Sequence, residues 1–263
     1  ICCLSSLNLA RWEEWKDYTF ENGMTLPELV CWFLEGVLQE FIDRAKNIKF
    51  MENTVRSAIK GRAIGIGVLG WHTFLQAKGI PFVGIQANSF TRIMFDFIEK
   101  EALKASRDQA EFYGEPEWCK GYGVRNTHRI AIAPNLSSAL ICGSVSQGIE
   151  PIYKNAYVQN TSAGKMDRVN PSLLKIMKEK GVYTKSVVKD IISNNGSVQQ
   201  VDWLSDEEKA VFKTAFEIDQ KQIVRLASAR QRYVDQAQSI NFFFSADEAE
   251  EYISEVHKLA LKD

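Results

Sequence analysis

The thiol of cysteine is the most reactive side-chain group in this protein. The sequence contains five cysteines, Cys2, Cys3, Cys31, Cys119 and Cys142. Cys2 and Cys3 are adjacent in the run 1–9 (ICCLSSLNL), which predicts a buried strand and its exit. Neighbouring side chains of a strand point to opposite faces, so at most one of the two can face a given pocket. One interpretation is a redox thiol that meets a second thiol across a cavity. The other is a small buried apolar side chain.

A second candidate site is the segment 133–139 (APNLSSA). A strand predicted over 129–133 stops at Pro134, and Ser137 and Ser138 come just before an apolar stretch that favours the start of a helix. Backbone N–H groups at the start of a helix, together with serine hydroxyls, can hold a phosphate without a cation. The alternative interpretation is a strand-to-helix turn in which the serines cap the helix.

Two further motifs remain ambiguous. Gly65-x-Gly67-x-x-Gly70 matches a dinucleotide-binding fingerprint, but Lys60-Gly61-Arg62 precedes it and the acidic residue expected about 20 positions later is missing. We therefore favour close backbone packing along a strand over nicotinamide binding. The amide-rich segment 230–241 (RQRYVDQAQSIN) fits either the lining of a polar cavity or a solvated connection.

Composition excludes several classes of protein. The net charge of -1 over 263 residues argues against a broad nucleic-acid-binding face. The odd cysteine count, the absence of CxxC and three isolated histidines give no support for a metal site or a disulfide-stapled secreted domain. No apolar run has the length of a membrane span, and no secretory signal opens the sequence, so we expect a cytoplasmic protein without membrane contact.

The predicted elements alternate between strands and helices, which is typical of the α/β class with some parallel pairing. Sequences with capping-box spacing at 25–28, 205–208 and 245–248 predict three helix starts. Behind the first, Val30, Phe33, Val37, Phe41 and Ala45 recur at helical spacing. The predicted helices are 88–113, 171–180, 205–230 and 245–261; the predicted strands are 1–9, 64–68, 129–133 and 239–244; the predicted loops are 160–164 and 194–197.

Taken together, the motifs resemble one family, the large catalytic subunits of class I ribonucleotide reductases. The resemblance covers almost the whole chain and keeps the family's order. The segments that carry it are 2–9, 62–70, 79–82 (GIPF), 133–139, 148–151 (GIEP) and 232–244.

The resemblance implies a ten-stranded α/β barrel made of two parallel five-stranded halves. Residues 1–263 would form most of the second half, incomplete without the N-terminal part and without the allosteric N-terminal domain. The implied reaction replaces the ribose 2′-hydroxyl of a ribonucleotide with hydrogen, after a thiyl radical abstracts the 3′ hydrogen. A cysteine pair then supplies two electrons, and Cys2 matches one member of that pair. The implied substrate-phosphate loop is Pro134, Asn135, Leu136, Ser137 and Ser138.

The resemblance also implies partners and cofactors. The family's radical cysteine lies in an Asn-x-Cys-x-Glu motif that this sequence lacks, as it lacks the tandem tyrosines of the radical pathway. We therefore expect no metal or cofactor in this chain and no activity from it alone. The N-terminal half of the large subunit would be one partner, on the same or a separate chain, and it would bind dNTP or ATP effectors. A metal-containing small beta subunit would supply the radical, and thioredoxin or glutaredoxin the electrons.

Two other classes of function stay open on the residues alone. The first is a non-catalytic scaffold or binding fragment that keeps part of the barrel. The second is a nicotinamide-dependent oxidoreductase built on the glycine motif.

Overall fold

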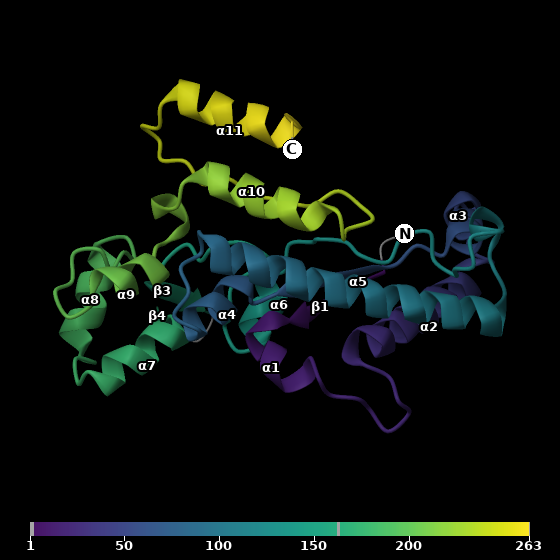
Figure 1. The fold of residues 1–263 in the computed structure, drawn as a ribbon, viewed down its shortest axis with the longest axis horizontal. Coiled ribbons are helices and arrows are strands. Elements are labelled where there is room, and N and C mark those ends of the chain that lie inside the picture. Colours follow the sequence, from purple (N-terminus) through teal and green to yellow (C-terminus); the bar gives the residue numbers. More distant parts are fainter. Residues whose placement is uncertain (1–2, 162–163, 263) are drawn as a thin grey trace. The chain divides into compact units, whose positions relative to one another are not determined.

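The computed structural model describes residues 3–161 and 164–262, so Cys2 lies outside the described residues. The chain divides into two compact units, 1–68 with 91–134 and 229–239, and 69–90 with 135–228 and 240–263. The main elements in chain order (Figure 1) are β1 Leu4–Asn8, α1 Trp12–Trp15, α2 Leu26–Ala45, α3 Glu52–Gly61, β2 Gly65–Leu69, α4 Trp71–Ala77, α5 Ile85–Tyr113, α6 Leu136–Ile141, β3 Ala156–Thr161, β4 Gly164–Val169, α7 Pro171–Glu179, α8 Lys185–Ser193, α9 Asp206–Val211, α10 Gln220–Gln231 and α11 Glu250–Lys262.

The first unit is built around neighbouring extended segments. β1 pairs with β2, and the Gly65 N–H donates to the Cys3 carbonyl at 2.9 Å. Ile66 forms a parallel bridge with Ile130, and Ile132 forms another with Gln238. The order is therefore β1, β2, 130–132 and Gln238, which confirms an α/β unit with parallel pairing. The described residues form no closed barrel.

The glycines of β2 are required by close packing. A Cβ at Gly65 would lie 2.5 Å from Leu4 Cδ2 and 2.8 Å from Ala131 Cβ, and one at Gly67 would lie 2.6 Å from the Ala131 carbonyl oxygen. All five residues of β2 are buried. The backbone of this strand is thus closely packed at Gly65 and Gly67, which supports the packing interpretation.

We expect Gly67→Ala to destabilise the protein by about 1–3 kcal/mol, the usual cost of overpacking. The opposing atom belongs to backbone that is itself held, because the Ala131 N–H donates to the Ile66 carbonyl at 3.1 Å. Gly36→Ala is the matched control, since a Cβ at Gly36 would meet nothing within 4 Å. That change should stabilise α2 by about 0.5–1 kcal/mol. Urea unfolding of both variants measures the difference, and equal effects would contradict the packing argument.

The start of α2 and the end of α5 are where the sequence predicts, although α5 begins at Ile85 and not at residue 88. The Thr25 N–H donates to Glu28 Oε2 at 2.7 Å, as a capping box requires, and α5 ends before Gly114, whose φ is +82°. The face that α2 buries is not the one marked by the apolar residues that recur at helical spacing in the sequence. Two of those residues, Phe33 and Val37, are 64% and 40% exposed. Its buried apolar residues are Cys31, Leu34, Leu38, Ile42 and Ala45.

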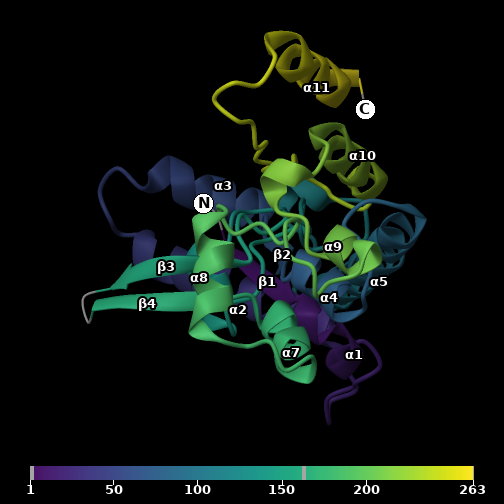
Figure 2. The same cartoon turned by 90° about the vertical axis from the view of Figure 1, so that its left-hand side faces the viewer.

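The second unit contains a hairpin that the sequence did not indicate. β3 and β4 pair antiparallel from Ala156↔Val169 to Thr161↔Gly164, so most of the predicted loop 160–164 belongs to strands. α8 packs on β3 (Figure 2), and the core beside the hairpin is apolar. Its members include Ala156, Leu173, Met177, Val188, Ile191 and Phe212. The predicted turn at 194–197 is confirmed, with φ of +57° at Asn195 and +81° at Gly196.

Three predictions near the C-terminus are wrong. The helix predicted over 205–230 is divided, because a second capping box at Thr214 and Glu217 starts a new turn between α9 and α10. The strand predicted over 239–244 does not form. The Ser239 N–H donates to the Ile132 carbonyl at 3.2 Å, but side chains bind N–H groups farther along, since Asn241 donates to Glu150 and Phe243 to Gln220. The last helix begins at Glu250 instead of after Ser245.

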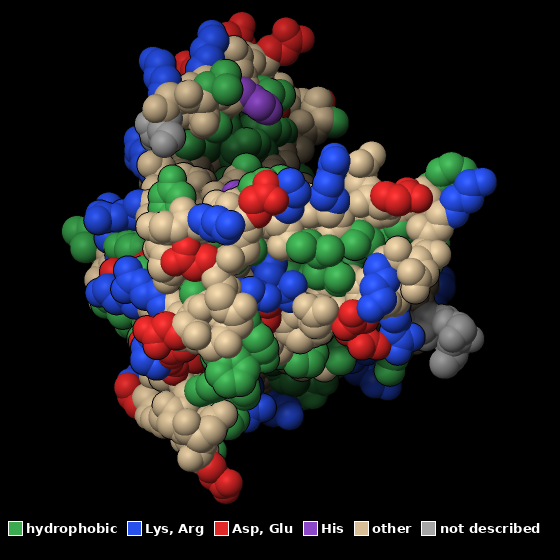
Figure 3. Space-filling model, turned by 90° about the vertical axis from the view of Figure 1, so that its right-hand side faces the viewer, with side chains coloured by type: hydrophobic (Ala, Val, Ile, Leu, Met, Phe, Trp, Pro, Cys, Tyr) green, Lys and Arg blue, Asp and Glu red, His purple; other side chains and the backbone are tan. Residues whose placement is uncertain are grey.

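Charges of both signs are interspersed on the face drawn in Figure 3, with hydrophobic side chains between them. This distribution matches a net charge of -1. Within the described ranges, no helix combines the length and the apolar composition that a membrane span requires.

Candidate functional site

The extended segment that leads into the candidate phosphate loop is held by one carboxylate. The strand predicted over 129–133 is present only as isolated bridges at Ile130 and Ile132. Asp235 Oδ2 accepts hydrogen bonds from the backbone N–H groups of Arg129 (2.6 Å) and Ile130 (2.9 Å). Its Oδ1 also pairs with Arg129 Nη2 at 2.9 Å. The aspartate of the amide-rich segment therefore fixes the start of the extended segment that ends at Pro134.

The predicted phosphate-loop residues continue from this segment into α6. Asn135 occupies the N-cap position of α6 without a side-chain capping bond, and Leu136 is the first helical residue. Ser137 and Ser138 lie in the first turn and are exposed, and their hydroxyls make no hydrogen bond to another described residue. The serines therefore do not cap the helix, which leaves both hydroxyls available to a ligand.

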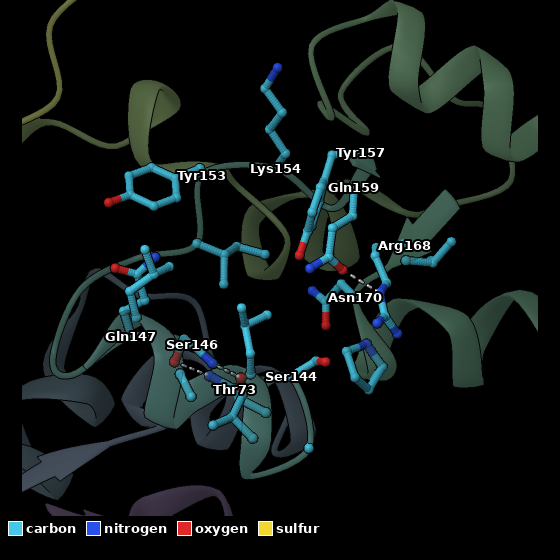
Figure 4. Close-up of a pocket in the computed structure, with 18 of the residues that line it drawn as sticks. Thr73, Ser144, Ser146, Gln147, Tyr153, Lys154, Tyr157, Gln159, Arg168 and Asn170 are labelled. Atoms are coloured by element: carbon cyan, nitrogen blue, oxygen red, sulfur yellow. Dashed lines mark hydrogen bonds between the residues drawn. The ribbon is translucent and has the colours of Figure 1, made fainter. Parts of the chain in front are cut away.

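The loop that follows α6 is pinned to α4 (Figure 4). The Thr73 N–H donates to Ser146 Oγ at 3.1 Å, and the Ser146 N–H donates to Thr73 Oγ1 at 2.8 Å. The Gly70 N–H also donates to the Ser146 carbonyl at 2.8 Å. Gly70, the last glycine of the motif, and Thr73 thus fix the position of the loop that follows α6.

Two motifs far apart in the sequence meet at Glu150. Its Oε1 accepts from the side-chain amide of Asn241 at 2.7 Å and from the Asn241 N–H at 3.2 Å. Burial raises the pKa of Glu150, and the two hydrogen bonds from Asn241 oppose that shift. The GIEP segment and the amide-rich segment are therefore brought together.

His72 supports the same region from within. Its side chain is fully buried, and Nδ1 accepts from the Ile152 N–H at 3.0 Å. Burial lowers the pKa of His72 to about 3, while a backbone hydrogen bond at Val211 opposes the shift. His72 is therefore neutral at physiological pH and serves as a structural acceptor.

The described cysteines differ in their environments. Cys3, Cys31 and Cys119 are buried, and Cys142 is exposed. Burial raises the pKa of Cys31 to about 12 and also raises the pKa of Cys119, so neither is a ready thiolate. Cys2, the predicted redox cysteine, lies outside the described residues.

A cavity of about 610 Å³ lies beside α6, and sequence reasoning missed it. Its walls come from α4, α6, the loop after α6 and the β3–β4 hairpin. Residues as far apart as Thr73 and Pro171 line it, so no local motif marks it. Within the described ranges, no group of three or more His, Cys, Asp or Glu side chains is arranged to hold a metal ion.

Parallel extended segments, one of which leads into the helix that carries Ser137 and Ser138, place the chain in the α/β class. Known proteins agree with this class. The family model described as "Ribonucleotide reductase, barrel domain" matches residues 1–118 and 116–263. The chain belongs to this family.

Individual relatives match over the whole chain. The putative ribonucleoside-diphosphate reductase large subunit of Frog virus 3 (isolate Goorha) is 42% identical over 263 residues, covering 100% of this chain and 45% of the relative. The ribonucleoside-diphosphate reductase large subunit of Invertebrate iridescent virus 6 is 38% identical, covering 100% of this chain and 27% of the relative.

A solved structure agrees with the sequence relatives. The Actinobacillus ureae class Id ribonucleotide reductase alpha subunit superposes with a TM-score of 0.91 at 41% identity, covering 99% of this chain and 47% of that chain. The chain therefore spans less than half the length of these relatives.

Proposed function

We propose that this chain forms part of the catalytic barrel of a ribonucleoside-diphosphate reductase large subunit and contributes to the reduction of ribonucleotides to deoxyribonucleotides. The observation that carries the proposal is the start of α6. Two serine hydroxyls with no partner among the described residues follow an extended segment held in place by Asp235, in a chain that belongs to the ribonucleotide reductase family.

In this proposal the chain supplies the second half of the ten-stranded barrel. The neighbouring extended segments support it, because two of their bridges are parallel and β2 is buried throughout. The segment 134–138 would hold the substrate diphosphate with backbone amides and the two hydroxyls. Cys2 would be one of the two thiols that reduce the substrate and end as a disulfide.

The remaining parts would come from elsewhere. The rest of the large subunit would carry the radical cysteine, the second redox thiol and the dNTP or ATP effector sites. A metal-containing small subunit would generate the radical in the cytoplasm, and a thioredoxin- or glutaredoxin-type dithiol would restore the thiols. Relatives named as large subunits support these partners.

Reconstitution tests the proposal. The chain is combined with the remainder of a large subunit and with a small subunit, and formation of dCDP from CDP is measured with a dithiol reductant. Turnover by the complex, with none from the 263 residues alone, is the expected result. A complex that assembles and binds CDP but forms no dCDP would favour a scaffold role instead.

We expect the double change Ser137→Ala and Ser138→Ala to weaken nucleoside diphosphate binding by about 1–3 kcal/mol, the usual loss for charge-assisted hydrogen bonds. Backbone amides would retain the remaining affinity. Equilibrium dialysis with CDP on the reconstituted enzyme measures the change. Ser57→Ala on the exposed side of α3 is the control, and unchanged affinity in the double variant would remove the serines from the site.

A further inference from the structure

The cavity beside α6 offers hydrogen-bond donors without an opposing negative charge. Arg168 contributes its guanidinium, and its Nε donates to Gln159 Oε1 at 2.7 Å, which leaves the Gln159 amide nitrogen free to donate. Tyr157 and Ser144 also line the cavity, and neither hydroxyl bonds to another described residue. None of the described lining residues carries a carboxylate.

The donors gather on one side of the cavity. Tyr157 and Arg168 are directly paired across the hairpin, so their side chains lie on the same face of it, and Gln159 follows two residues after Tyr157. Figure 4 shows Tyr157 and Gln159 directed toward Asn170, with Ser144 on the loop beneath. The Lys154 side chain lies at the rim and extends away from the cavity, so Arg168 is the cation that faces inward.

Asn170 makes this side rigid. It is 9% exposed, and its amide donates to Gln76 Oε1 at 2.9 Å and to Asn155 Oδ1 at 3.0 Å. Its Oδ1 accepts from the Ser172 N–H at 3.1 Å. The residues that follow Arg168 are therefore fixed, and the hairpin presents its donors from a held position.

Part of the remaining lining is apolar. Leu140, Val145, Ile152 and Pro171 provide aliphatic surface beside the donors. A cavity of about 610 Å³ falls in the usual range for small-molecule sites, roughly 300–1,000 Å³. A guanidinium with uncharged hydrogen-bond donors beside it can bind a phosphate, and the aliphatic side chains can pack against a planar ring.

The cavity shares Leu136 with the candidate substrate loop but is not lined by the two serines. Its other α6 residues are Ala139 and Leu140, and neither Ser137 nor Ser138 lines it. Residues three and four apart share one face of a helix, so the serines lie on the other sides of α6.

We propose that this cavity is a second anion-binding site, which takes a small phosphorylated molecule of nucleotide size, with Arg168 holding the phosphate. The proposal does not depend on the reductase activity, because the groups that would hold the phosphate, Arg168, Gln159 and Tyr157, lie in the hairpin and not in the substrate loop.

Protection of Arg168 from phenylglyoxal tests the site in the 263-residue chain, with modified peptides quantified by mass spectrometry. ADP is expected to slow modification of Arg168 at least about fivefold, and adenosine, which lacks phosphate, to have no effect. The protection should persist in the Ser137→Ala, Ser138→Ala double variant. Absence of protection by ADP, or its loss in the double variant, would overturn the proposal.

Binding variants provide the second measurement. Arg168→Gln should weaken ADP binding at this site about tenfold or more, as expected for a charge-assisted contact, and Tyr157→Phe should weaken it less. Lys165→Gln is the matched control, because Lys165 is an exposed cation on the same strand. If Tyr157→Phe, which keeps the ring, and Arg168→Gln both bind ADP as the control does, the site is refuted.

Discussion

Cys2→Ser is expected to abolish multiple turnover in the reconstituted reductase, whereas Cys3→Ser leaves it largely intact. The physical reason is electron supply, because each turnover consumes two electrons that a pair of thiols delivers and a serine cannot. The strand predicted over 1–9 would place the side chains of Cys2 and Cys3 on opposite faces, so only one of them would face the cavity. Cys3 is 6% exposed, and its carbonyl accepts from the Gly65 N–H at 2.9 Å, which places its backbone in the β1–β2 pairing.

The measurement is dCDP formed per enzyme over many cycles with a dithiol reductant. Both variants carry the same Cys-to-Ser change one residue apart, so each controls for the other. Substrate binding is measured alongside, so that a misfolded variant is recognised. Loss of activity in Cys3→Ser with normal activity in Cys2→Ser would show that the strand has the opposite orientation.

Glu35→Ala is expected to destabilise the protein by about 3–5 kcal/mol, since it leaves buried cations without a counter-charge. Glu35 is 4% exposed, and its Oε1 lies 2.5 Å from Arg62 Nε and 2.8 Å from Arg125 Nε. Asn126 adds a hydrogen bond to Oε2 at 3.3 Å. The carboxylate thereby joins α2 to the end of α3 and to the chain beyond α5.

Glu40→Ala on the same helix is the control for Glu35→Ala. Glu40 pairs with Arg44 at 2.5 Å, but the two side chains are 62% and 79% exposed. Removal of such a surface pair should cost at most about 0.5 kcal/mol. Urea unfolding at neutral pH compares the two variants, and equal losses of stability would mean that the buried network contributes no more than a surface pair.

The sequence predicted those elements whose ends carry local signals. The capping boxes at Thr25 and Ser205 each start a helix, and Gly114 ends the long one. The glycines of β2 were also interpreted correctly, because a failed dinucleotide fingerprint left close packing as the better explanation.

The errors occur where distant contacts decide the structure. The run 239–244 has the composition of a strand, but Glu150 and Gln220, far away in the sequence, bind its N–H groups. The hairpin β3–β4 was missed because its strands contain few β-branched residues and expose most of β4 to solvent. It is stabilised instead by α8 and by the apolar core beside it.

The candidate site could be predicted only in part. The serines of 137–138 lie in consecutive positions of one motif, so the sequence reveals them. The contacts that shape their surroundings join Thr73 to Ser146 and Glu150 to Asn241, and the cavity beside α6 draws on segments about 100 residues apart. Such pairs leave no local pattern, which is why sequence reasoning did not find them.

Disulfide mapping after a single turnover tests whether Cys2 is one of the two redox thiols. The reconstituted enzyme is fully reduced, freed of reductant and given CDP, and its cysteine peptides are then identified by mass spectrometry. We expect one dCDP per active site and a new disulfide between Cys2 and a cysteine in the rest of the large subunit. If one dCDP forms while Cys2 remains a free thiol, or if Cys3 is found in the disulfide, the role assigned to Cys2 is wrong.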